Sequence, residues 1–128
     1  MAFLLDTHTF LWFINGDKKL PISIKNKIED TKIPCFLSVA SLWEIAIKLQ
    51  IKKLQINMSF EDLYKLAKQN DIEILEIGES HLNTFINVDF IHKDPFDRLI
   101  ISQAISEDLI LITKDKGLKN YNVKQQWA

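Results

Sequence analysis

The stretch that decides the fold lies between positions 94 and 115 and contains two runs, Asp94-Pro95-Phe96-Asp97-Arg98-Leu99-Ile100-Ile101-Ser102-Gln103-Ala104 and Leu109-Ile110-Leu111-Ile112-Thr113-Lys114-Asp115. The first run opens with two acids and a proline and continues as an apolar helix. The second is short, apolar and partly β-branched, which predicts a buried strand followed by Asp115. A helix that leads into such a strand is half of a parallel α/β repeat, in which chemistry gathers where strands end and helices begin. We therefore expect Asp97 and Asp115 at one edge of a parallel sheet.

Strands and helices are expected to alternate along the rest of the chain. Apolar runs predict strands at 2–5, 35–37 and 72–77. Helical spacing and capping residues predict helices at 9–14, 21–28, 39–49, 59–67 and 79–87. The segment 121–123 is interpreted as a weak edge strand before a polar tail. This alternation favours an α/β fold in which helices cover both faces of a parallel sheet.

Length and composition indicate an ordinary globular protein. A chain of 128 residues predicts one domain, 1–128, which is large enough to bury a core. Hydrophobic residues make up 47% of the chain and charged residues 26%, which excludes a disordered polar chain. The formal net charge of -1 provides no bulk attraction for nucleic acid, so any such binding requires a local patch.

The single cysteine and the N-terminal sequence predict a cytoplasmic protein. Cys35 lies in an apolar run and has no partner for an internal disulfide, which fits a small core residue in a reducing compartment. The first residues lack a basic segment, and Asp6 interrupts their short apolar run. This pattern matches neither a signal peptide nor a membrane span, so no membrane association is expected.

Four acids are expected to meet at the edge of the sheet where the strands end. Asp6 follows the first strand, and Glu44 lies early in the helix after the second strand. Asp97 opens the helix that precedes the strand at 109–113, and Asp115 follows that strand. Carboxylates that are brought together without matching arginines repel one another. Clusters of oxygen ligands of this kind hold Mg²⁺ or Mn²⁺, which can activate water and stabilise charge on a phosphoryl group.

Each acid also has a structural interpretation. Asp94 and Pro95 fit an N-cap and a first helical position, and the helix dipole would then stabilise the negative charge of Asp97 in the first turn. Asp6 and Asp115 can each cap the turn that follows a strand. The stretch from Ser41 to Glu44 fits a capping box if its helix begins only at Leu42. The convergence of four acids, and no single one of them, indicates a metal site.

Basic residues and histidines near these acids are candidates for contact with a phosphate backbone, although a solvated face explains each one alone. They are Lys48, Lys93, Arg98, Lys114, Lys116, His8 and His92. No two histidines have the spacing of a metal-ligand pair, so a surface role is expected for His81, and substrate contact is an alternative for His8 and His92. The spacing of Trp12 and Trp43 favours packing over base stacking.

Four segments together resemble the PIN domain, and most closely the VapC-like ribonuclease toxins of bacterial toxin–antitoxin pairs. They are Leu4-Leu5-Asp6-Thr7-His8, Ser41-Leu42-Trp43-Glu44-Ile45, Asp94-Pro95-Phe96-Asp97-Arg98-Leu99-Ile100 and Leu111-Ile112-Thr113-Lys114-Asp115. The resemblance spans nearly the whole chain in the same order. No segment is specific alone, but the ordered set is.

The resemblance implies an α/β/α sandwich with a central parallel sheet and cleavage of RNA that depends on Mg²⁺ or Mn²⁺. It implies that Asp6, Asp97 and Asp115 are the principal metal ligands, directly or through water. Glu44 would orient the attacking water or help to deprotonate it. The family also implies a homodimer and a cognate antitoxin whose tail enters the groove.

The resulting hypothesis is a metal-dependent endoribonuclease, the toxin of a type II toxin–antitoxin module, in which a metal-activated water hydrolyses RNA phosphodiesters. A rival enzymatic function would use Asp6 as a covalent nucleophile for phosphoryl transfer. His8 weakens this function because it stands where haloacid-dehalogenase-like enzymes place a second acid. Two rival functions involve no catalysis. One is a phosphate-accepting signalling domain, which Glu44 within a helix fits poorly, and the second is a domain that binds RNA or a partner without cutting.

Overall fold

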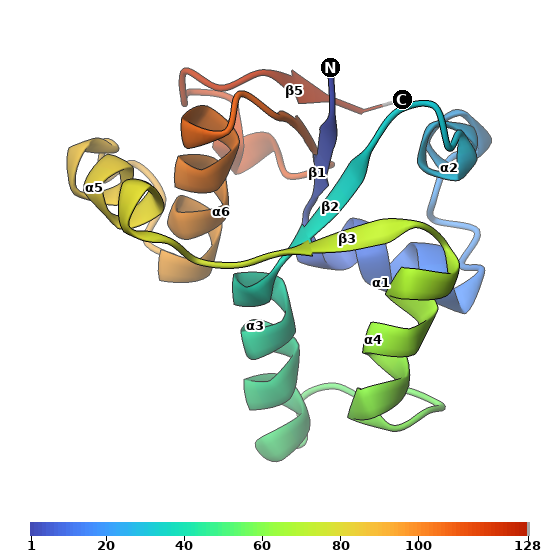
Figure 1. The fold of residues 1–128 in the computed structure, drawn as a ribbon. Helices are drawn as coiled ribbons and strands as arrows, with labels where there is room; N and C mark the ends of the chain where they lie inside the picture. Colours follow the sequence, from blue (N-terminus) through green and yellow to red (C-terminus); the bar gives the residue numbers. More distant parts are fainter. Residues whose placement is uncertain (128) are drawn as a thin grey trace.

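The structure of the protein, a computed structural model, describes residues 1–127 and is built around a five-stranded parallel sheet (Figure 1). The strand order is β3-β2-β1-β4-β5, so β1 lies in the middle. The strands are β1 (Phe3–Leu5), β2 (Cys35–Ser38), β3 (Ile72–Leu75), β4 (Ile110–Ile112) and β5 (Gln125–Gln126).

Helices cover both faces of this sheet, which confirms the predicted α/β/α sandwich. The helices are α1 (Thr7–Asn15), α2 (Ile22–Glu29), α3 (Val39–Gln50), α4 (Phe60–Gln69), α5 (Glu79–Asn87) and α6 (Pro95–Ser106), with a 3₁₀ turn, η1, at Lys116–Leu118. Figure 1 shows α5 and α6 on one side of the sheet and α1, α2 and α4 on the other. No helix within residues 1–127 combines the length and apolar character that crossing a membrane requires.

The central strand β1 explains why the first apolar run does not alternate with polar residues. Phe3 and Leu5 pack into the core beneath α1, α2 and α4, whereas Leu4 packs into the core beneath α6. All three side chains are buried because the sheet is covered on both faces. Such doubly buried strands are characteristic of parallel sheets.

Helix α3 begins directly after β2, without an intervening loop. Ser38 is its N-cap, and its Oγ accepts a hydrogen bond from the backbone N–H of Ala40 at 2.9 Å. The interpretation of Ser41 and Glu44 as a capping box is therefore wrong, because the helix starts before Leu42. The direct junction places the first turns of α3 at the edge of the sheet where β2 ends.

The predicted edge strand at 121–123 is also wrong, since the final strand lies at Gln125–Gln126. The side chain of Tyr121 is buried, and its hydroxyl accepts hydrogen bonds from the backbone N–H groups of Ile91 and His92. This contact draws the segment away from β4. Pairing with β4 begins only beyond it, where the backbone N–H of Leu111 donates to the carbonyl of Lys124.

Cys35 is a core residue of β2, as expected from the sequence. Its side chain is buried, and this burial, with a smaller effect of the negative charge of Asp30, raises the pKa of the thiol to about 11. A thiol with so high a pKa contains very little thiolate at neutral pH and is unreactive.

Candidate active site

The predicted acids gather at the carboxyl edge, by which we mean the edge of the sheet where β1, β2 and β4 end. The three strands end in register, so the segments that follow them start side by side. Asp6 follows β1, and Glu44 lies in the second turn of α3. Asp97 lies in the first turn of α6, and Asp115 follows β4 and precedes η1.

Asp6 is buried and is held by two donors. Its Oδ1 accepts a hydrogen bond from the backbone N–H of Thr9 at 2.8 Å, and its Oδ2 accepts one from the hydroxyl of Thr113 at 2.6 Å. Asp6 is thus the N-cap of α1, as its structural interpretation proposed. Thr113 Oγ1 also accepts from the backbone N–H of Asp115 at 3.0 Å, so one threonine orients both acids.

Glu44 is buried and charge-compensated. Its Oε1 accepts a hydrogen bond from the hydroxyl of Thr7 at 2.8 Å, and its Oε2 lies 3.0 Å from Lys48 Nζ. The pair is one helical turn apart in α3. Lys48, which was a candidate for phosphate contact, is therefore directed to this carboxylate.

Asp97 lacks such compensation. Within residues 1–127 its only ion-pair partner is His92, whose Nε2 lies 3.5 Å from Asp97 Oδ2. Burial raises the pKa of Asp97 to about 7, and the negative charges of Asp94, Glu44 and Asp115 contribute to this rise against the opposing effect of His92. The carboxyl edge therefore carries more negative charge than its own cations neutralise.

Asp115 faces the same imidazole. His92 Nε2 lies 3.6 Å from Asp115 Oδ2, and Asp115 Oδ1 accepts a hydrogen bond from the backbone N–H of Gly117 at 2.8 Å. One side-chain atom from each of His92, Asp97 and Asp115 lies within 4.8 Å of the other two. His92 belongs to the loop before α6. Its nearness to Asp94 in the sequence made it a candidate for substrate contact, but nothing in the sequence placed its side chain between Asp97 and Asp115.

The chemistry of this donor set fits a divalent cation. Two carboxylates face one another without a lysine or arginine within ion-pair distance in the described part of the chain. Oxygen ligands suit Mg²⁺ and Mn²⁺, which complete their coordination with water. Asp6 and Glu44 lie at the same edge but outside the group of closest atoms, and protein donors bind their oxygens.

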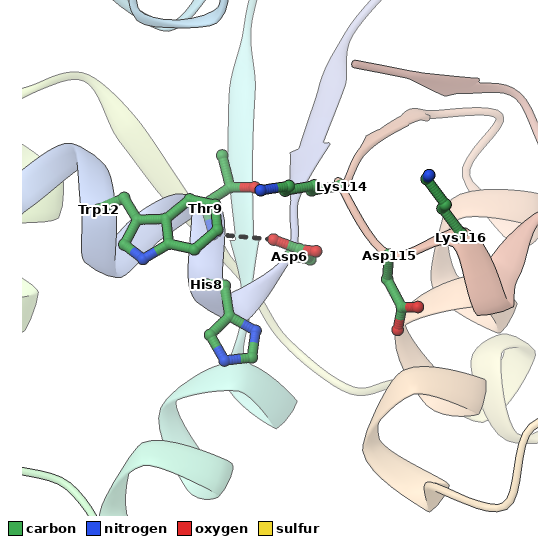
Figure 2. A pocket seen from close by; sticks show the side chains of 7 residues that line it. All are labelled: Asp6, His8, Thr9, Trp12, Lys114, Asp115 and Lys116. Atoms are coloured by element: carbon green, nitrogen blue, oxygen red, sulfur yellow. Dashed lines mark hydrogen bonds between the residues drawn. The ribbon is translucent and has the colours of Figure 1, made fainter. Parts of the chain in front are cut away.

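A hollow of about 410 Å³ opens beside Asp6 and Asp115 (Figure 2). Its other lining residues are His8, Thr9, Trp12, Lys114 and Lys116. The exposed His8 lies 5.9 Å from the ring of Trp12, and Lys114 Nζ lies 5.8 Å from the centre of the same ring. Trp12 also packs edge-on against Trp127. It therefore has the packing role expected from the sequence and also lines this hollow.

Two predicted residues of this region have other roles. The guanidinium of Arg98 lies over the rings of Phe90, at 4.2 Å, and Phe85, at 5.0 Å, so the structure does not bring it to the acids. Arg98 was expected to contact substrate because it follows Asp97 in sequence, but successive helical residues point in different directions. Asp94 is the N-cap of α6, and its Oδ1 accepts from the backbone N–H of Phe96 at 2.8 Å.

Several solved toxin–antitoxin complexes contain a chain of the same fold. The chain is 19% identical to one in VapBC2 from Rickettsia felis bound to a DNA fragment from its promoter, with a TM-score of 0.74 and coverage of 98% of both chains. It is 18% identical to one in DNA-bound VapBC from Salmonella typhimurium, with a TM-score of 0.69 and coverage of 98% of this chain and 97% of that one. For VapBC-1 of nontypeable Haemophilus influenzae, the identity is 16%, the TM-score 0.67 and the coverage 98% and 97%.

Two further comparisons concern the sequence itself. None of the curated proteins matches it. The family model of the PIN domain matches residues 3–124, which includes all four acids and every strand except β5. The chain therefore belongs to the PIN domain family.

Proposed function

We propose that this PIN domain protein is a metal-dependent endoribonuclease that hydrolyses RNA phosphodiesters. The observation that carries the proposal is the pairing of Asp97 and Asp115 at the carboxyl edge without a lysine or arginine among residues 1–127 to neutralise them. Their carboxylates would hold Mg²⁺ or Mn²⁺, with Asp6 and Glu44 acting directly or through water. When bound, such an ion activates water and neutralises charge on the phosphate.

The neighbouring residues have assigned roles in this proposal. Thr7 and Lys48 fix the carboxylate of Glu44, which would orient the attacking water. Lys114 and Lys116 line the hollow beside Asp6 and would bind the phosphates that flank the cleaved bond. His8 would contact the same strand of RNA.

We further propose that the protein is a cytoplasmic VapC-like toxin with a cognate antitoxin. The support is the similarity of its fold to a chain in each of several VapBC complexes. An antitoxin that reaches the hollow beside Asp6 would compete with RNA. A homodimer of one-domain subunits is the expected assembly.

Exposed apolar residues support the homodimer. We name the following residues the α5 patch: Trp43 (56% exposed), Leu82 (50%), Ile86 (79%), Phe90 (69%) and Ile91 (45%). Trp43 of α3 and Leu82 of α5 line one apolar cleft, so the patch spans two helices. Large exposed apolar patches mark protein–protein interfaces.

The decisive experiment is cleavage of a mixed RNA pool by the purified protein with Mg²⁺, with Mn²⁺ or with a chelator. We expect metal-dependent cleavage that Asp97→Asn reduces by at least about 100-fold. The matched control is Asp108→Asn, because Asp108 is exposed and lies before β4 at the opposite edge of the sheet, and its one ion-pair partner among residues 1–127 is Lys124.

The proposal fails if antitoxin-free protein cuts no RNA with either metal, or if Asp97→Asn cuts as well as Asp108→Asn. Labelling by acetyl phosphate in place of cleavage would indicate a phosphate-accepting domain. RNA binding without metal-dependent turnover would indicate a binding domain.

A further inference from the structure

The imidazole of His92 faces the two acids that would hold the metal ion. Its Nε2 lies 3.5 Å from Asp97 Oδ2 and 3.6 Å from Asp115 Oδ2. Both distances exceed those of an ordinary hydrogen bond. Nε2 therefore points into the space between the two carboxylates and is bound tightly to neither.

The other ring nitrogen determines which tautomer is present. Nδ1 of His92 accepts a hydrogen bond from the backbone N–H of Asp94 at 3.1 Å. A ring nitrogen that accepts has no proton, so in the neutral imidazole the proton lies on Nε2. Asp94 N–H cannot turn away, because Asp94 is the N-cap of α6.

This tautomer argues against a metal–nitrogen bond. A histidine that binds a metal through Nε2 needs its lone pair there and its proton on Nδ1, where it donates to an outer partner. Here a proton on Nδ1 would face the N–H of Asp94, and two donors would be opposed. His92 therefore presents a donor, and not a lone pair, to the carboxyl edge.

The ring is also held in place by its surroundings. The hydroxyl of Tyr121 accepts hydrogen bonds from the backbone N–H groups of His92, at 2.7 Å, and Ile91, at 3.1 Å. On the other side the ring packs against η1, where a Cβ on Gly117 would come within 3.3 Å of His92 Cδ2. A donor fixed in this way loses little freedom when it meets its acceptor.

We propose that His92 is a substrate-binding residue whose Nε2–H donates a hydrogen bond to a non-bridging oxygen of the scissile phosphate. The inference rests on the proposed ribonuclease function and adds the atom and role of one residue to it. The carboxylates of Asp97 and Asp115 repel the phosphates of RNA. A neutral hydrogen-bond donor between them would give the scissile phosphate a partner in addition to a bound ion.

Two substitutions separate the ring nitrogens. The amide NH₂ of His92→Gln can occupy the place of Nε2–H, whereas the amide oxygen of His92→Asn can accept from Asp94 N–H but supplies no donor at the Nε2 position. We expect His92→Asn to lower kcat/KM for RNA by about 10- to 100-fold and His92→Gln to retain most of the activity. We expect both variants to bind Mn²⁺ as the wild type does in isothermal titration.

Two measurements test the inference without turnover. Fluorescence anisotropy with RNA is measured in the presence of Ca²⁺, which carries the charge of Mn²⁺ but lacks its octahedral preference and is used to prevent turnover. It should show weaker binding for His92→Asn than for His92→Gln. In pulsed electron paramagnetic resonance of bound Mn²⁺, the wild type and the His92 variants should show the same nitrogen coupling, because His92 does not bind the ion. His8→Gln is the control for the magnetic resonance measurement, because His8 is an exposed histidine of the same edge outside the group of closest atoms.

The inference is overturned if Mn²⁺ affinity falls by about tenfold or more in both His92 variants, or if the wild type shows a nitrogen coupling that they lack. Either result would make His92 a metal ligand. It is also overturned if His92→Asn binds and cuts RNA as well as His92→Gln does. Failure of the ribonuclease proposal looks different, since the wild type would then cut no RNA with any metal, and the anisotropy measurement would still decide whether His92 contacts the phosphate backbone.

Discussion

At the residue scale, the charges of the carboxyl edge are unequally compensated. Glu44 has Thr7 and Lys48 as partners, and Asp6 accepts from two donors. Within residues 1–127, the one ion-pair partner of Asp97 is the His92 imidazole. Asp97 is the acid that this imbalance affects most. Its burial and the neighbouring acids raise its pKa to about 7. Binding sites for cations commonly carry such destabilising charge until the ion arrives.

The raised pKa predicts how the stability of the metal-free protein depends on pH. Between about pH 4 and 7 the folded state keeps a proton on Asp97 that the unfolded state has lost, so stability falls as pH rises through this range and levels off above it. The loss amounts to a few kcal/mol, since one pKa unit corresponds to about 1.4 kcal/mol. We expect Asp97→Asn to remove most of this loss in urea unfolding at pH 5 and pH 8 with a chelator present.

Asp108→Asn serves again as the control and should keep the pH dependence of the wild type, because its carboxylate is 82% exposed. Mn²⁺ added at pH 8 should stabilise the wild type and not Asp97→Asn, since an ion that binds only the folded state favours folding. An Asp97→Asn variant as sensitive to pH as the wild type would contradict the prediction.

The residues of the site could be predicted to different extents. Asp6, Glu44, Asp97 and Asp115 could be placed at one edge because strand ends and helix starts are visible in the sequence. The orientation of a single side chain could not. The position of His92 depends on the path of the loop before α6 and on the hydrogen bond from its backbone N–H to Tyr121, 29 residues later. The hydrophobic periodicity of the sequence does not predict such a long-range contact.

At the scale of elements, one buried pair links α6 to the start of α3. The hydroxyl of Ser38, the N-cap of α3, donates to Gln103 Oε1 in α6. Gln103 Nε2 donates to the backbone carbonyl of Glu76 at 3.2 Å, so the same side chain also holds the segment before α5. Because α3 carries Glu44 and α6 carries Asp97, this pair helps to fix the spacing of the two acids.

We expect Gln103→Ala to lower the free energy of unfolding by about 3 kcal/mol. The substitution leaves the carbonyl of Glu76 without its donor and opens a cavity at a fully buried position. The measurement is urea unfolding followed by circular dichroism. Gln50→Ala at the exposed end of α3 is the matched control and should change stability by less than about 0.5 kcal/mol. Equal losses in the two variants would show that the buried pair contributes nothing.

The elements themselves were largely predictable, and the exceptions have physical causes. The start of α3 was ambiguous because both Ser38 and Ser41 are good N-caps, and only the direct junction with β2 favours Ser38. The last strand was misplaced because Val123 favours strands by composition, whereas Gln125 and Gln126 pair with β4 through backbone hydrogen bonds that residue composition does not reveal. Tertiary contacts decided both cases.

At the scale of the whole molecule, the α5 patch predicts self-association. We expect the protein to sediment as a dimer and Ile86→Asp to sediment as a monomer, because a charge placed in an apolar interface must be desolvated. The control is Ile22→Asp in α2, since Ile22 is 76% exposed and Ile86 79%. Analytical ultracentrifugation distinguishes the outcomes. A monomeric wild type, or a dimer that survives Ile86→Asp, would reject the α5 patch as the interface.

The central place of β1 also has a consequence for how the protein is made. This strand leaves the ribosome before the other strands of the sheet, and one of its two neighbours, β4, is synthesised more than a hundred residues later. At about 5–20 residues per second, that interval lasts on the order of ten seconds. During this time Asp6 has no Thr113 to orient it and no Asp115 beside it. A nascent chain therefore has no complete carboxyl edge until β4 and Asp115 have left the ribosome. Under the proposed function, a copy that has not reached this point could not cut the RNA around the ribosome that is making it.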